Sequence, residues 1–226
     1  MTKRTDNFYV VVASATIDPK IFLKFFEKEK CKPLEVPGRV FPVTLLNWPE
    51  IIETEQNNDE DDRNKKIIKK ATMSPKFVVE KVIEVIKKFD EGHTLVFLPG
   101  QKDCETCVQM FSKLAPKNFE ALPLFGALSS EEQKKVLEFE RNKPVGKDRL
   151  VAFCTNVAET SLTVEGVKIV IDSGLSKESR YDMKRRANVL EMSWISKSSA
   201  NQRKGRAGRT SEGTCIRLFS EGSLIH

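Results

Sequence analysis

The chain has 226 residues, enough for one large domain or for one domain with an appendage, and it carries a formal net charge of +6. No apolar run approaches the ~18 residues of a membrane-spanning helix, and the N-terminal segment MTKRTDNF lacks the apolar core of a signal peptide. We therefore exclude membrane and secreted proteins and expect an intracellular protein, of the nucleus or cytoplasm, whose basic charge fits a polyanionic partner.

Short apolar runs alternate with helical periodicities along the chain. We expect buried strands at residues 9–14, 94–98, 149–154 and 167–172, because each run is nearly continuously apolar, as parallel strands are. Helices are expected at residues 77–89, 102–114 and 130–140, and the last of these opens with a predicted capping box from Ser129 to Glu132. This alternation predicts an α/β fold, a mostly parallel sheet with helices on both faces and ligand loops at the carboxyl ends of its strands.

Two further segments invite chemical interpretations. Residues 53–66, ETEQNNDEDDRNKK, are nearly free of apolar side chains, and we predict a disordered surface insertion. No apolar strand precedes its acids, so no metal site is expected in this chain. Cys104 and Cys107 form a C-x-x-C, but there is no second pair and the segment has a helical pattern, which favours coincidence over zinc or redox chemistry.

The stretch ANQRKGRAGR, residues 200–209, carries three arginines and a lysine together with two glycines. In a helix, Gln202, Arg206 and Arg209 would share one face, with Arg203 to the side. Gly205 and Gly208 each cost a helix about 1 kcal/mol, which close approach of another backbone or a ligand would offset. A solvated basic face is one interpretation, but planar guanidinium groups also suit bidentate phosphate contacts.

Polar residues follow the predicted strands. TNVAETSLT, residues 155–163, follows one strand, PGQ, residues 99–101, follows another, and the first strand runs into SAT, residues 14–16. Each could be ordinary loop polarity. Together with the arginine-rich stretch they describe a surface for a nucleotide and a sugar-phosphate backbone.

In order and spacing, the strings SATID, VPGRVFPV, TLVFLPGQ, LPLFGALSSEEQ, TNVAETSLT, IDSGLSK and SANQRKGRAGR resemble the successive motifs of the DEAH-box RNA helicases, superfamily 2 enzymes built from two RecA-like lobes. The resemblance covers nearly the whole chain, and Gln202 stands where the DEAD-box family has histidine. It implies that residues 1–40 are the last strand of the first lobe and the inter-lobe linker, and that residues 41–226 form the second RecA-like lobe.

The resemblance also implies roles near ATP. Arg206 and Arg209 would be the finger arginines that reach the γ-phosphate, with Gln202 beside them, and Ser161 would help to position the attacking water. Thr163 and Glu165 would face the nucleotide, although family members commonly have aspartate at the second position. Where the family has a phenylalanine that stacks on adenine, this chain has Leu137, with Phe139 two residues later as a substitute.

On the RNA side, the resemblance places Gly100, Gln101, Thr155 and Asn156 against the backbone of single-stranded RNA, which predicts little base preference. Residues 179–196 have the pattern of a β-hairpin with a basic tip at Lys184, Arg185 and Arg186. The tip would lie at the 5′ side of the bound strand, or it could be a plain solvated turn. Ser14, Ala15 and Thr16 would couple the two lobes.

The sequence contains neither G-x-x-x-x-G-K-[ST] nor a DEAH tetrapeptide, so ATP and Mg²⁺ would both need a first lobe in the same protein. Two hypotheses follow. The chain is either the second motor lobe of an ATP-dependent RNA helicase, or a catalytically inactive RNA-binding or regulatory module. In both cases the chain alone is expected not to hydrolyse ATP, and the first hypothesis allows for an activating protein partner.

Overall fold

The computed structural model describes residues 10–13, 19–27, 31–34, 41–47, 74–160, 162–183, 186–219, 222 and 224. The chain separates into two compact units, residues 1–38 and 39–226. The predicted insertion at residues 53–66 lies outside the described residues, as do Ser14, Ala15 and Thr16.

The first unit contains helix α1, Pro19–Phe25. Of the strand predicted at residues 9–14, Val10 to Ala13 are described, and they form no strand and are exposed. That prediction is wrong for this chain. A strand needs a neighbouring backbone to pair with, and the described part of this unit contains none.

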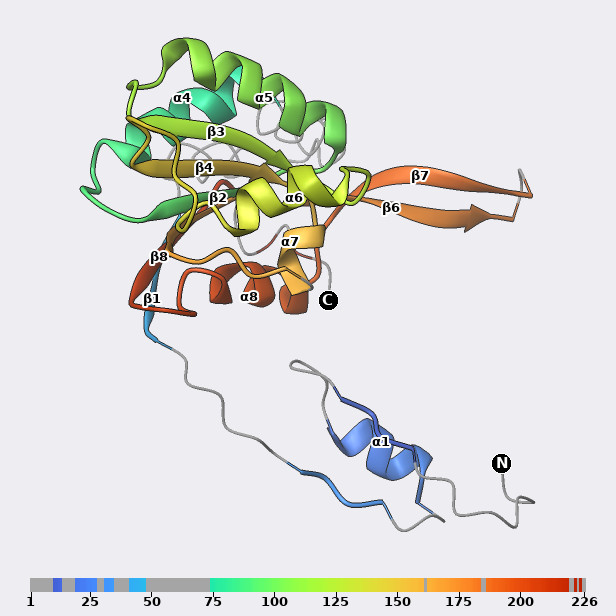
Figure 1. Cartoon of the computed structure of the whole chain (residues 1–226). Helices are drawn as coiled ribbons and strands as arrows, with labels where there is room; N and C mark the ends of the chain where they lie inside the picture. The colour runs from blue at the N-terminus through green and yellow to red at the C-terminus, as the bar shows by residue number, and fades with distance from the viewer. Residues whose placement is uncertain are drawn as a thin grey trace. The chain divides into compact units, whose positions relative to one another are not determined.

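The second unit is built on a six-stranded parallel sheet with the order β1-β8-β5-β2-β4-β3 (Figure 1). Its strands are β1 (Val43–Asn47), β2 (His93–Phe97), β3 (Phe119–Leu124), β4 (Arg149–Cys154), β5 (Val167–Asp172) and β8 (Gly213–Arg217). The strands predicted at 94–98, 149–154 and 167–172 are therefore confirmed as β2, β4 and β5, which lie side by side in the middle of the sheet. The pattern did not reveal β1, β3 and β8.

Helices cover both faces of this sheet, as predicted. They are α4 (Pro75–Ile86), α5 (Gln101–Leu114), α6 (Ser130–Leu137), α7 (Val157–Thr160) and α8 (Lys197–Gly205). Alternate strand residues separate two apolar clusters. Val96, Phe153 and Ile171 belong to the cluster with α4 and α5, whereas Phe97, Ala152 and Val170 belong to the cluster with α6 and α7. Figure 1 shows α4 and α5 on one side of the sheet and α6, α7 and α8 on the other.

The predicted capping box is present at the start of α6. The Ser129 hydroxyl accepts a hydrogen bond from the Glu132 main-chain N–H, and the Glu132 carboxylate accepts one from the Ser129 N–H at 2.9 Å. The helix ends at Leu137, three residues before the predicted end.

The predicted β-hairpin is also present. Strands β6 (Leu175–Asp182) and β7 (Ala187–Trp194) pair antiparallel, and the hairpin projects away from the parallel sheet (Figure 1). Arg186 at its tip has a left-handed φ of 49°, while Lys184 and Arg185 lie outside the described residues.

Among the described residues, no helix is both long and apolar enough to cross a bilayer. Within the same part of the chain, no group of three or more His, Cys, Asp or Glu side chains is placed to hold a metal ion. Cys104 and Cys107 are buried free thiols, and burial raises the pKa of both.

Candidate functional site

The carboxyl edge of the sheet gathers the loops after β2, β4 and β5. Gly100, three residues after the end of β2, is the N-cap of α5, and Thr155 and Asn156 lie between β4 and α7. Because β2 and β4 are neighbours in the sheet, these loops lie at the same end of adjacent strands. The structure thus brings together the residues predicted to contact an RNA backbone.

Gly100 is closely approached by a basic side chain from the hairpin. A Cβ atom at this position would lie 2.6 Å from the Lys177 ammonium nitrogen, which is 3.4 Å from the Asp103 carboxylate. Gln101 is exposed, and its side-chain amide donates to Glu105 one turn further along α5, at 2.9 Å. The absence of a side chain at Gly100 therefore leaves room for the Lys177 ammonium group at the start of α5.

Helix α8 carries the arginine-rich stretch, and it ends earlier than expected. The helix spans Lys197–Gly205, Arg206 is its C-cap, and Arg209 lies beyond it. The face predicted for Gln202, Arg206 and Arg209 is therefore not a continuous helical face. Gln202 is half-buried within the helix.

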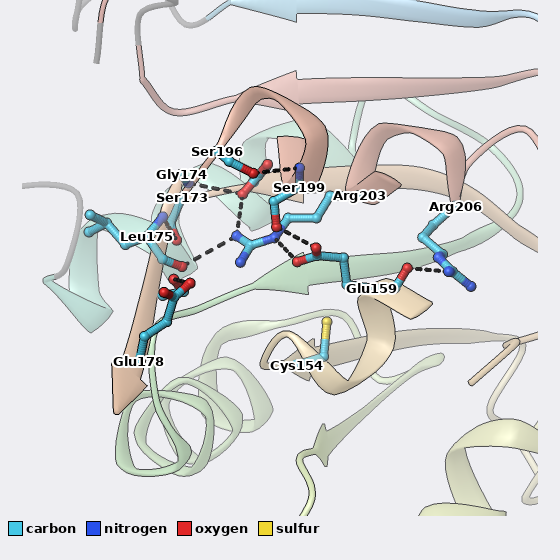
Figure 2. Close-up of polar contacts among 12 residues, drawn as sticks. Cys154, Glu159, Ser173, Gly174, Leu175, Glu178, Ser196, Ser199, Arg203 and Arg206 are labelled. Atoms are coloured by element: carbon cyan, nitrogen blue, oxygen red, sulfur yellow. Dashed lines mark hydrogen bonds and ion pairs between the residues drawn. The ribbon is translucent and has the colours of Figure 1, made fainter. Parts of the chain in front are cut away.

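Arg203 is fully buried between two carboxylates. Its Nε atom is 3.1 Å from Glu159 Oε2 (Figure 2), and its Nη1 atom is 2.8 Å from Asp172 Oδ1. The guanidinium also lies 4.9 Å from the centre of the Phe97 ring. Burial alone would lower the pKa of Arg203, but the charges and hydrogen bonds of Asp172 and Glu159 outweigh burial and raise it. Arg203 thus joins β5, α7 and α8.

Arg206 lies beside α7 and is 7% exposed. Its guanidinium donates to the main-chain oxygen atoms of Glu159 and Leu162, the latter at 3.1 Å. Burial, with the nearby charge of Arg209, lowers its pKa to about 10, so the group stays charged at neutral pH. Among the described residues, no carboxylate accepts a hydrogen bond from it.

The loop between α7 and β5 holds the residues predicted to face a nucleotide. Arg209 donates to the Thr163 hydroxyl, and both side chains are exposed. Glu165 is paired at 2.5 Å with Arg141, which follows α6, and lies two residues before β5 begins. Ser161 lies outside the described residues.

Phe139 cannot take the stacking role considered for it. The ring is 2% exposed and packs edge-on against His93, with their ring centres 5.2 Å apart. It lies in a turn that follows the end of α6 and belongs to the same apolar cluster as Val136 of that helix. Leu137 is half-buried, so it is more accessible than Phe139 to a base that would stack there.

Two residues of this site escaped the sequence analysis. Glu159 is the only acid between Asp148 and Glu165, and Asp172 ends an apolar strand. A single acid at or just after a buried strand could have indicated them, because a buried carboxylate needs a cationic partner and the arginine-rich stretch offers one.

Residues 78–211 match the model of the helicase conserved C-terminal domain family. The chain is 36% identical over 222 residues to the ATP-dependent RNA helicase HrpA of Escherichia coli, covering 98% of this chain and 15% of that protein. It is 40% identical over 224 residues to the ATP-dependent RNA helicase DEAH12, chloroplastic, of Arabidopsis thaliana, covering 99% of this chain and 12% of that protein. The chain thus spans less than a sixth of either relative.

Among solved structures, the chain is similar to the Escherichia coli DEAH/RHA helicase HrpB, with a TM-score of 0.71 and 28% identity over 92% of this chain and 24% of that one. The fold, the order of the sequence motifs and the similar proteins all indicate the same family. The chain therefore belongs to the helicase conserved C-terminal domain family and is the C-terminal RecA-like lobe of a DEAH-type helicase.

Proposed function

We propose that the chain is the second motor lobe of an ATP-dependent RNA helicase, binding the backbone of single-stranded RNA and supplying Arg206 and Arg209 to ATP. The ATP and Mg²⁺ would be held mainly by a first RecA-like lobe in the same protein. One observation carries the proposal. Arg206 is a buried cation whose hydrogen bonds go to main-chain oxygen atoms, and among the described residues no carboxylate accepts a hydrogen bond from it.

An arginine in this state attracts an anion more strongly than a solvated one does. The guanidinium is already ordered by two acceptors, and its surroundings are poor in water, so an approaching phosphate meets a weakly screened charge. Arg209, three residues after Arg206, adds a second positive charge, and that charge is felt at Arg206. This pair suits the charge that develops on γ-phosphate oxygens.

The RNA assignment is supported by the loops at the carboxyl edge. Gly100 and Gln101 begin α5, where main-chain N–H groups point outward and favour a phosphate, and Lys177 adds a positive charge beside them. Thr155 and Asn156 follow the adjacent strand. Contacts of this kind position a strand and do not read its bases, so we propose binding without strong sequence preference.

The nucleotide part is tested in a two-lobed protein, a chimera that joins a family first lobe to this chain. Arg206→Ala should lower the rate of ATP hydrolysis by about 10³ to 10⁵, and Arg206→Lys should restore little, because an ammonium keeps the charge but loses the planar fork. Lys197→Ala, a basic exposed residue of α8, is the matched control. Turnover within a few-fold of the parent in folded Arg206→Ala would refute the assignment.

The RNA part is tested by fluorescence anisotropy with the chain itself. Neutralising the three basic residues of the hairpin tip should weaken binding uniformly across single-stranded sequences and reduce the salt dependence, which should already be shallow. The variant replaces Lys184, Arg185 and Arg186 with Gln, and the control replaces Lys76, Lys88 and Lys113, which are exposed on or beside α4 and α5. An affinity that depended strongly on base identity, or an equal loss in the control, would contradict the backbone assignment.

A further inference from the structure

Glu159 contacts α8 through its side chain and the C-cap of α8 through its main chain. Its Oε1 atom accepts from the Ser199 hydroxyl, its Oε2 atom accepts from Arg203 Nε at 3.1 Å, and its main-chain oxygen accepts from Arg206 (Figure 2). The three partners are spaced at i, i+4 and i+7, so they lie along one side of α8 and its cap. Glu159 alone therefore contacts all three residues on this side of α8 and its C-cap.

The contacts of Glu159 are buried and well supported. The Glu159 side chain is only 12% exposed, that of Arg203 is 0% exposed, and Arg203 is also held by Asp172 at the end of β5. The Glu159 main-chain N–H donates to the Asn156 oxygen at 2.9 Å, which fixes the turn that starts α7. Charge-assisted hydrogen bonds in such surroundings are strong and geometrically demanding, so α7 has little freedom to move relative to α8.

Two main-chain oxygen atoms determine where the Arg206 guanidinium lies. Both belong to the segment that Glu159 anchors, since one is its own carbonyl oxygen and the other is that of Leu162, three residues later. A shift of α7 would move the Glu159 oxygen with the helix, and it would displace the start of the segment that carries the Leu162 oxygen. The Glu159 carboxylate makes its hydrogen bonds to Ser199 and Arg203, and its charge is also felt at Arg206. The direct contact between the two residues is the one from the Arg206 guanidinium to the Glu159 main-chain oxygen, so Glu159 orients the arginine through the backbone that it holds.

We propose that Glu159 is the positioning residue for Arg206. Its carboxylate binds Arg203 and Ser199, which fixes α7 against α8 and places the two carbonyl oxygen atoms that orient the Arg206 guanidinium. This inference rests on the proposed function, in which Arg206 acts on ATP. It predicts that loss of the Glu159 charge affects turnover only through Arg206.

The test is a double-mutant cycle in the two-lobed chimera, measuring kcat and KM for ATP. Glu159→Gln keeps the size of the side chain and an acceptor for Ser199, but removes the negative charge opposite Arg203. With Arg206 present, we expect kcat to fall by about 10 to 100-fold and KM to change by less than about 3-fold, as for a misplaced catalytic group. In an Arg206→Lys background, the same substitution should lower the residual kcat by less than about 3-fold.

The outcomes separate the two proposals. If Glu159→Gln lowers kcat equally in both backgrounds, the positioning role is overturned. If Arg206→Lys itself leaves turnover near the parent value, the proposed function fails instead. Should Glu159→Gln not fold, Ser199→Ala decides the question, because it removes one carboxylate contact and leaves the buried charges balanced. Its smaller loss of kcat must also vanish in the Arg206→Lys background, and an undiminished loss there overturns the proposal.

Discussion

Replacing Arg203 with Ala should strongly destabilise this chain. Arg203 is fully buried and is bound to the carboxylates of Glu159 and Asp172, so its removal leaves two acids buried without their cation. Removing one partner of such a pair costs about 3 to 5 kcal/mol, and because Arg206 remains near Glu159 we expect the lower part of that range. A domain with a free energy of unfolding of about 5 to 15 kcal/mol would lose a large share of its stability.

Urea unfolding followed by circular dichroism measures this loss directly, and thermal unfolding should show a fall in Tm of roughly 6 to 12 °C for a loss of about 3 kcal/mol. Arg209→Ala is the matched control, because Arg209 is exposed and its described hydrogen bond goes to the Thr163 hydroxyl. That control should change the free energy of unfolding by less than about 0.5 kcal/mol. If Arg203→Ala lost less than about 1 kcal/mol, the reasoning on the buried ion pairs would be refuted.

Three further outcomes are expected of the chain itself. Gly208→Ala should destabilise it by about 1 to 3 kcal/mol, because a Cβ at this position would lie 2.6 Å from the Phe41 main-chain oxygen. Gly205→Ala should stabilise it by up to about 1 kcal/mol, because a Cβ there would meet no atom within 4 Å. Equal effects of the two substitutions in urea unfolding would contradict this expectation. Burial lowers the pKa of His93 despite its contact with Glu140. The unfolded chain therefore binds a proton more readily, and the free energy of unfolding should fall as the pH drops below about 6.5, by at most about 1.4 kcal/mol per pH unit. When urea midpoints are measured as a function of pH, His93→Gln should remove this contribution. An unchanged pH dependence of stability in His93→Gln would contradict the expectation for His93. A phosphate-release assay should find no ATP turnover by the isolated chain, and activity that survived repurification would overturn the third.

The local sequence pattern was sufficient for the centre of the fold. Strands β2, β4 and β5 are buried on both faces and therefore read as continuous apolar runs, and the capping box at Ser129 depends only on residues three positions apart. Strands β1 and β3 lie at the edges of the sheet and have mixed exposure, so their patterns are weak. The ordered motifs indicated the family because their spacing is a property of the sequence alone.

Tertiary structure decided what each polar or aromatic side chain contacts. Four arginines and lysines in ANQRKGRAGR look alike in sequence, but only packing against α7 and β5 buries Arg203 between two acids and leaves Arg206 with main-chain acceptors. Phe139 looked available for stacking, and the turn after α6 placed it in the core. Burial and ion pairing depend on residues that are distant in sequence, such as Glu159 and Arg203, so the sequence determined which groups were present while the fold determined their electrostatic surroundings.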